Sequence, residues 1–260
     1  MRRLWPLAAA AVAVAAVCAV AALRPWAAES SAVVATAQDT AVVVAPAPLV
    51  LPERPRVLIF GDSWTYGSAA SLPTLGYAYI LGERLGWLTT VDGVRGSGYL
   101  KPGLDGGSYG ERIDALDPAL DPDLVIVEGS INDRRLSADG YPDAVTAAWD
   151  SLAALYPEAS IVIMGPAPQI LPVEATTARI DADLAHLAAA RGWWYVSPIA
   201  DGWITTENYA DVIDSGIGRD HPSTAGHAYL ATRLAEALAA LSEGTDVAAD
   251  APRDSELSGP

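Results

Sequence analysis

The segment Arg56-Val-Leu-Ile-Phe-Gly-Asp-Ser63 joins a short apolar run to a glycine, an aspartate and a serine. An apolar, partly β-branched run of this length that ends at glycine predicts a buried strand over residues 56–60, followed by a loop. The run Leu-Val-Ile-Val at 124–127 is the clearest strand in the chain. Weaker runs of the same kind predict strands over 88–91, 161–164 and 194–197.

Helical patterns lie between these strands and after the last of them. They cover residues 75–85, 141–155, 173–190 and 224–241. Strands that alternate with helices predict a parallel sheet covered on both faces. Five strands favour a flavodoxin-like fold of the α/β class, a three-layer α/β/α sandwich with a mostly parallel sheet. Sheets of this kind bind ligands beyond the carboxyl ends of their strands.

Both ends of the chain depart from this pattern. Arg2 and Arg3 precede an apolar run over 7–23, which is typical of an export signal. Ala35-Thr-Ala37 would suit cleavage, but the run is nearly long enough to span a bilayer, so an uncleaved anchor is the alternative. We therefore predict a secreted or extracytoplasmic protein, or one anchored by its N-terminal helix. The predicted organisation is a signal peptide or signal anchor at 1–37, a flexible linker at 38–55, a folded domain at 56–242 and a disordered acidic tail at 243–260.

Charge and cysteine usage restrict the partners. The 260 residues carry a formal net charge of −16, which predicts a surface that repels nucleic acid and anionic lipid headgroups. We expect neutral substrates, no nucleic acid, a monomer, and membrane contact only through the N-terminal segment. The single cysteine, Cys18, lies in the N-terminal apolar run, which excludes disulfides, zinc-thiolate sites and a cysteine nucleophile from the folded domain.

Three polar segments lie at predicted strand ends or before the last helix. They are Gly61-Asp-Ser-Trp64, Gly129-Ser-Ile-Asn-Asp133 and Arg219-Asp-His-Pro222. A serine hydroxyl needs an adjacent base to act as a nucleophile, and His221 can supply one to Ser63. The oxyanion of acyl transfer needs oriented donors. The Ser63 N–H, the Asn132 amide and a glycine N–H from the glycine-rich loop at 93–110 are candidates.

In this order, the Gly-Asp-Ser-Trp block, the glycine-rich segment, the Gly-Ser-Ile-Asn-Asp block and the Asp-His-Pro block resemble the SGNH (GDSL-like) hydrolase superfamily. The resemblance spans residues 56 to about 241. It implies a serine ester hydrolase with Ser63 as nucleophile and His221 as base. It further implies an oxyanion hole of Ser63, Gly96 and Asn132, with Gly98 as the alternative register for Gly96. Neither a metal nor an organic cofactor is implied.

The block that contains His221 departs from the family pattern. The usual acid stands three residues before the histidine, where this chain has Gly218. The nearest carboxylate is that of Asp220, and those of Asp214 and Asp211 lie further back. The resemblance also implies a known variant in which the main-chain carbonyl at the −3 position orients the imidazole. Asp220, the Gly218 carbonyl and a more distant aspartate therefore remain three alternatives for the group that orients His221.

Taken singly, each motif also fits a turn or a helix cap, and only their joint order favours a site. We predict that Trp64, Tyr99 and Trp203 line a groove for a sugar or an acyl chain. His227 is expected to pack or to cap the last helix. The function predicted is an exported serine esterase for acetyl or other short-chain acyl esters of small molecules or glycans. The alternatives are a non-catalytic glycan-binding protein and a cell-surface acyltransferase on the same fold.

Overall fold

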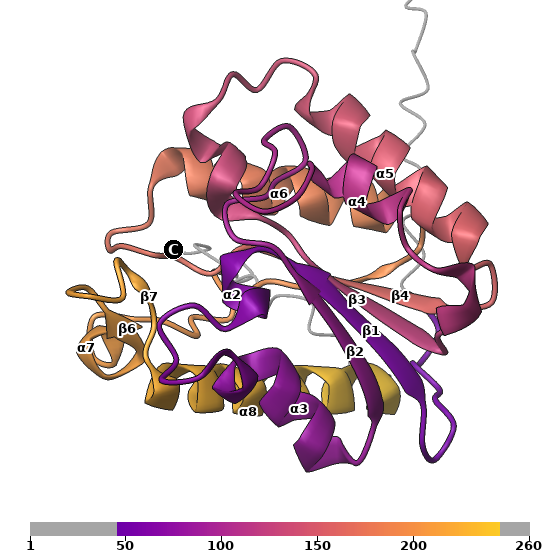
Figure 1. The fold of residues 1–260 in the computed structure, drawn as a ribbon, viewed down its shortest axis with the longest axis horizontal. Helices are drawn as coiled ribbons and strands as arrows, with labels where there is room; N and C mark the ends of the chain where they lie inside the picture. The colour runs from indigo at the N-terminus through magenta and orange to yellow at the C-terminus, as the bar shows by residue number, and fades with distance from the viewer. Residues whose placement is uncertain (1–45, 245–260) are drawn as a thin grey trace, which may run out of the picture. The chain divides into compact units, whose positions relative to one another are not determined.

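The computed structural model of this chain describes residues 46–244 (Figure 1). Five parallel strands form one sheet in the order β2-β1-β3-β4-β5. The predicted strands and the flavodoxin-like strand order are therefore confirmed. The strands are β1 (Arg56–Gly61), β2 (Leu88–Gly93), β3 (Leu124–Glu128), β4 (Ser160–Met164) and β5 (Trp194–Val196).

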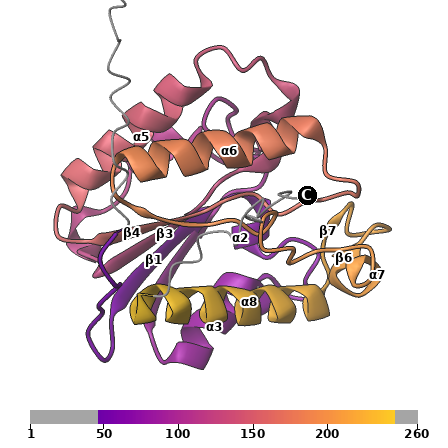
Figure 2. The ribbon, with the colours of Figure 1, turned by 180° about the vertical axis from the view of Figure 1, so that it is seen from behind.

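Helices cover both faces of the sheet, which confirms the three-layer prediction (Figures 1 and 2). One face carries α3 (Tyr77–Leu85) and α8 (Thr224–Glu243), which pack against each other. The other face carries α4 (Tyr109–Ile113), α5 (Tyr141–Leu155) and α6 (Ala175–Ala190).

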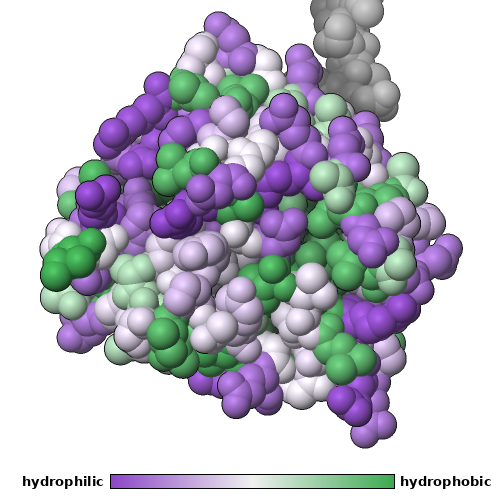
Figure 3. Space-filling model, in the orientation of Figure 1, coloured by the Kyte–Doolittle hydropathy of each residue, from purple (hydrophilic) through white to green (hydrophobic). Residues whose placement is uncertain are grey.

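The hydrophobic core consists of one layer on each face of the sheet. In β1, Val57 and Ile59 pack on the side of α3 and α8, and Leu58 and Phe60 pack on the other side. All four side chains are buried, which explains why the strand reads as a continuous apolar run rather than an alternating one. On the face seen in Figure 3, hydrophobic residues form separate patches among hydrophilic ones.

Several short elements were not predicted from the sequence. They are α2 (Ser63–Tyr66), η1 (Pro73–Leu75), η2 (Pro118–Leu120), η3 (Ile131–Arg135), α7 (Tyr209–Val212), β6 (Ile213–Asp214) and β7 (His221–Pro222). The predicted glycine-rich loop at 93–110 is also shorter than expected. It ends at Ser108, whose side chain and Glu111 form a reciprocal cap that starts α4.

The predicted linker at 38–55 is wrong for its described part, residues 46–55. Leu49 is buried, and its N–H donates to the Leu241 carbonyl of α8. Trp194 Nε1 also donates to the Ala47 carbonyl, so this segment packs on the domain. The predicted export signal at 1–37 and most of the predicted tail lie outside the described residues. Between residues 46 and 244, no helix has the length and apolarity that a bilayer span needs.

Candidate active site

Ser63 is the first residue of α2, immediately after the turn that leaves β1. Asp62 caps this short helix, since its Oδ1 accepts from the Trp64 N–H at 2.9 Å. Gly61 is required for the turn because a Cβ there would lie 2.2 Å from Thr65 Oγ1. The turn therefore presents the Ser63 hydroxyl beyond the carboxyl end of β1.

The structure brings Ser63 and His221 together, although they lie 158 residues apart. His221 Nε2 is 2.9 Å from Ser63 Oγ. The other ring nitrogen, Nδ1, lies 2.9 Å from the Gly218 carbonyl oxygen and 3.1 Å from that of Arg219. Because carbonyl oxygens only accept, Nδ1 carries the hydrogen and donates to them. Nε2 is then the acceptor for the Ser63 hydroxyl.

Of the three alternatives for the group that orients His221, the structure places the Gly218 carbonyl at Nδ1, and the tentative choice of Asp220 is wrong. Asp220 has φ of 62°, and its N–H donates to the Asp214 carbonyl. Among residues 46–244, no carboxylate is hydrogen-bonded to the His221 imidazole. A Cβ at position 218 would lie 2.6 Å from Asp214 Cβ and 2.8 Å from Ala69 Cβ. The loop conformation therefore excludes the side chain of a family-type acid at this position.

The three predicted oxyanion donors line the same pocket as Ser63 and His221. The N–H groups of Ser63 and Gly96 have no hydrogen-bond partner within residues 46–244. Asn132 Nδ2 lies 2.8 Å from Asp62 Oδ2 and 3.0 Å from the Ser97 carbonyl oxygen, and these contacts orient the amide. Two free main-chain donors and one oriented amide thus surround the serine.

Gly98, the alternative register for Gly96, has a different role. It is buried, and a Cβ there would lie 2.6 Å from both carboxylate oxygens of Asp133. That carboxylate accepts three main-chain N–H groups, from Tyr99, Leu100 and Lys101. Burial raises the pKa of Asp133, and the three donors oppose this rise. Asp133 therefore holds the glycine-rich loop in place, and the absence of a side chain at Gly98 allows the Asp133 carboxylate to come close to the loop backbone.

The pocket around these groups has a volume of about 760 Å³. Tyr66, Pro73 and the small residues between them form one wall, and the glycine-rich loop, η3 and the β6–β7 loop form the others, with Gln169 from the segment after β4. The residues of the last three walls are Arg95, Gly96, Lys101, Leu104, Asn132, Arg134, Arg135, Leu136, Asp214, Ile217, Gly218, Arg219 and His221.

The groove-lining prediction for Trp64, Tyr99 and Trp203 is wrong. Their exposed fractions are only 4%, 4% and 2%, and none of them lines the pocket. Tyr99 packs on Tyr109, and its hydroxyl accepts from Trp149 Nε1 at 2.9 Å. Trp64 and Trp203 belong to the core layer beneath α8. Core packing therefore uses these aromatics, although all three lie near the site in sequence.

Comparison with known proteins agrees with this geometry. The model of the GDSL-like Lipase/Acylhydrolase family matches residues 59–229. The chain belongs to this family. A protein named GDSL lipase from Mycobacterium tuberculosis is 29% identical over 200 residues, which are 72% of this chain and 84% of that protein. The predicted superfamily membership is thus confirmed, and the protein is a hydrolase that acts on esters.

Solved structures of esterases share the fold of this GDSL-like hydrolase. The aryl esterase of Mycobacterium smegmatis is 18% identical with a TM-score of 0.53, over 71% of this chain and 98% of that one. Est24, a carbohydrate acetylesterase from Sinorhizobium meliloti, is 19% identical with a TM-score of 0.54, again over 71% and 98%. At these identities the likeness shows the fold alone.

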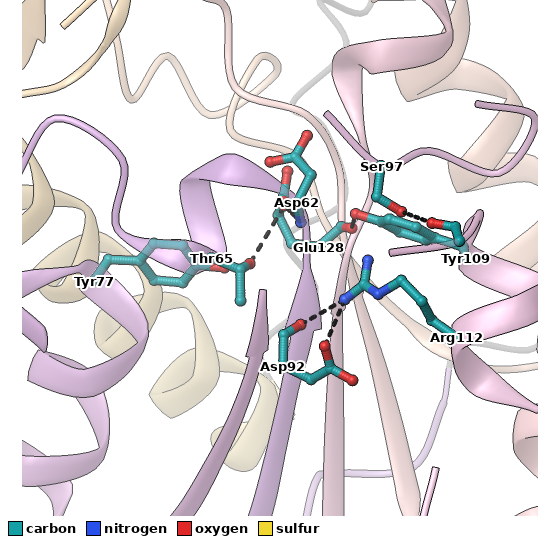
Figure 4. Close-up of polar contacts among 9 residues, drawn as sticks. Asp62, Thr65, Tyr77, Asp92, Ser97, Tyr109, Arg112 and Glu128 are labelled. Atoms are coloured by element: carbon teal, nitrogen blue, oxygen red, sulfur yellow. Dashed lines mark hydrogen bonds and ion pairs between the residues drawn. The ribbon is translucent and has the colours of Figure 1, made fainter. Parts of the chain in front are cut away.

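A buried polar network below the nucleophile of this GDSL-like hydrolase was missed in the sequence. Asp62 Oδ2 accepts from Ser130 Oγ at 3.0 Å, and the Asp62 N–H donates to Glu128 Oε2 at 2.9 Å. Figure 4 shows Asp62 and Thr65 on one side of Glu128 and Tyr109 on the other. Burial, and then the charge of Asp62, raise the pKa of Glu128 well above its usual value. The available signal was a glutamate at the end of an otherwise apolar strand.

His227, near the start of α8, is buried as predicted and lies outside the pocket. Its Nδ1 accepts from the Tyr77 N–H, and its Nε2 donates to the Ser68 carbonyl. Burial lowers its pKa to about 4. No group of three or more His, Cys, Asp or Glu residues with metal-binding geometry occurs within 46–244. The absence of a cofactor stays a prediction.

Proposed function

We propose that this protein is an exported serine esterase that hydrolyses acetyl and other short-chain acyl esters of small molecules or glycans. Ser63 is the nucleophile and His221 the general base. The observation that carries the proposal is the 2.9 Å separation of Ser63 Oγ and His221 Nε2, with the tautomer held by the Gly218 carbonyl. A base within hydrogen-bond distance of a serine hydroxyl can remove its proton during attack.

In the acylation step, Ser63 Oγ attacks the ester carbonyl while its proton moves to His221 Nε2. The carbonyl oxygen becomes an oxyanion, which the N–H groups of Ser63 and Gly96 and the Asn132 amide stabilise. The two main-chain donors have no acceptor among residues 46–244, so they are free to bind the oxyanion. One such donor typically accounts for about 10²–10³ in kcat.

Collapse of the tetrahedral intermediate then breaks the bond to the alcohol, which takes the proton from His221. A water molecule attacks the remaining acyl-enzyme and gives its proton to the same nitrogen. The second collapse releases the carboxylic acid and restores the Ser63 hydroxyl. Throughout, the positive charge on the imidazole ring is stabilised by the carbonyl oxygens of Gly218 and Arg219.

The pocket lining supports a short acyl group, and the N-terminal sequence supports export. The wall next to Ser63 contains four small residues, Gly67, Ser68, Ala69 and Ala70, between Tyr66 and Pro73. No long apolar segment within residues 46–244 covers the pocket. Related folds occur in a carbohydrate acetylesterase and in an esterase described as active on acetylated mannans. The basic and apolar N-terminal pattern at residues 1–37 favours action outside the cytoplasmic membrane.

The test is hydrolysis of p-nitrophenyl acetate by the wild type, Ser63→Ala and the control Ser71→Ala. Ser71 is exposed in the segment that follows α2, and its side chain does not line the pocket. We expect Ser63→Ala to lower kcat/KM by at least about 10³, and Ser71→Ala to have no such effect. Equal rates for all three proteins would refute the proposal. A series of acyl chain lengths and acetylated oligosaccharides then defines the substrate.

A further inference from the structure

The charge of the pocket is opposite to that of the protein. Residues 46–244 contain 12 Lys and Arg and 26 Asp and Glu. Five of these cations line the pocket, together with only one acidic residue, Asp214. The five are Arg95, Lys101, Arg134, Arg135 and Arg219. A random share of the surface of so acidic a domain would carry an excess of carboxylates.

Within residues 46–244, three of the five cations form no ion pair with a carboxylate. Arg95 is paired with Asp105, and Arg134 with Glu174. The side chains of Lys101, Arg135 and Arg219 form no ion pair or hydrogen bond with residues 46–244, and all three residues are exposed. They come from three separate walls, namely the glycine-rich loop, η3 and the β6–β7 loop. Three positive charges that form no ion pair thus converge on one concave surface, although Lys101 also attracts the buried Asp133 carboxylate electrostatically.

Apolar side chains accompany these cations on the same walls. Leu104 is 75% exposed, Leu136 is 44% exposed and Ile217 is 99% exposed, and each lies within a few residues of one unpaired cation. The walls therefore offer apolar contact together with positive charge. A ligand that uses both has an apolar or neutral part and an anionic group.

We propose that the natural substrate is an ester that carries an anionic group, a carboxylate or a phosphate, which Lys101, Arg135 and Arg219 bind. This inference rests on the proposed function of Ser63 and His221, and it revises the expectation of neutral substrates drawn from net charge. Net charge describes the whole surface, whereas a concave site responds to the charges that line it, because its low-dielectric walls focus their field. The cations select the ester and hold it while Ser63 attacks.

The test uses acetyl esters that differ in charge and share the transferred group. Methyl 4-acetoxybenzoate is neutral, 4-acetoxybenzoate carries a carboxylate, and 4-acetoxyphenyl phosphate carries a phosphate. The variant is Lys101→Gln/Arg135→Gln, since Arg219 also contacts His221 through its carbonyl. The control Arg54→Gln/Arg84→Gln removes two exposed charges near the amino ends of β1 and β2. Ser63 lies beyond the opposite ends of these strands.

We expect the Lys101→Gln/Arg135→Gln variant to lose about tenfold more kcat/KM on an anionic ester than on the neutral one. The control should leave this ratio unchanged, and added salt should reduce the wild-type preference. The anion that shows the larger effect identifies the group bound. Equal losses on charged and neutral esters would overturn the inference.

Calorimetry of Ser63→Ala with each intact ester keeps the two proposals separable. Ser63-dependent hydrolysis of the neutral ester without a charge effect leaves the proposed function in place and overturns only the anion site. If hydrolysis fails for every ester, the proposed function fails. Even then, the anion site is supported if Ser63→Ala binds an anionic ester and the further substitutions Lys101→Gln/Arg135→Gln weaken this binding. If Ser63→Ala binds no anionic ester, the anion site is overturned.

Discussion

The turn that carries Ser63 and the loop that carries His221 are built in different ways. Ser63 is 7% exposed, and the neighbouring Asp62 is held by Glu128, Ser130 and Asn132, which are 66 to 70 residues away. His221 is half-buried, and its Nδ1 contacts are carbonyls only two and three residues back. The nucleophile therefore depends on tertiary packing, whereas the orientation of the base depends on local backbone conformation.

The largest expected effect comes from removing the long-range contacts that hold the turn of Ser63. Asp62→Ala leaves the Trp64 N–H without its acceptor. It also removes one of the acceptors of the buried Ser130 hydroxyl and of the Asn132 amide, which both keep the Ser97 carbonyl. We expect the free energy of unfolding to fall by about 3–5 kcal/mol, and kcat/KM for p-nitrophenyl acetate to fall by on the order of 10². Urea denaturation and steady-state kinetics measure the two quantities.

Asp62→Asn provides the matched control, because its amide preserves the shape and one acceptor oxygen. It should lose less stability than Asp62→Ala. A loss below about 1 kcal/mol in Asp62→Ala would contradict the view that buried long-range contacts hold the nucleophile turn.

The second prediction concerns His227, whose ring contacts the segment after Ser63. His227 is fully buried, and its folded-state pKa of about 4 lies below the ordinary 6.5. The unfolded chain therefore binds the proton first, and stability that is present above pH 6.5 is lost as the pH falls toward 4. Between pH 6.5 and pH 4, the free energy of unfolding falls by about 3 kcal/mol through this group.

The measurement is the free energy of unfolding of the wild type and His227→Gln from pH 7 to pH 4. The wild type should lose about 3 kcal/mol relative to the variant over this range, because only the wild type has an imidazole that is protonated in the unfolded chain and kept neutral in the folded one. His186→Gln, at an exposed position of α6, is the control. If the free energy of unfolding changes equally with pH in the wild type and in His227→Gln, burial does not lower the pKa of His227.

The smallest effect is expected from a substitution in the loop that carries His221. Asp220→Asn removes the carboxylate nearest to His221 in sequence, but the structure gives that carboxylate no contact with the imidazole. Asparagine tolerates the left-handed backbone conformation at this position. We expect kcat/KM to stay within about twofold of the wild type. A tenfold loss that grows at low pH would mean that Asp220, and not the Gly218 carbonyl, orients the base.

Most of the fold could be predicted because its signals are local. Five apolar runs separated by helical patterns define a parallel α/β sheet, and the position of Ser63 and Asn132 after strands places them at its carboxyl edge. The short elements α2, α7, β6 and β7 could not be predicted, because they consist of two to four residues whose conformation follows from tertiary contacts.

The sequence by itself determined the sheet, the order of the motifs and the residue types needed for acyl transfer, because periodicity and chemical identity are written along the chain. Tertiary structure alone decided that His221 meets Ser63, that Trp64, Tyr99 and Trp203 belong to the core, and that five cations line the pocket of an otherwise acidic domain. These facts depend on which distant segments meet. A side chain's burial and its charged neighbours follow from packing in three dimensions, and neither composition nor spacing specifies that packing.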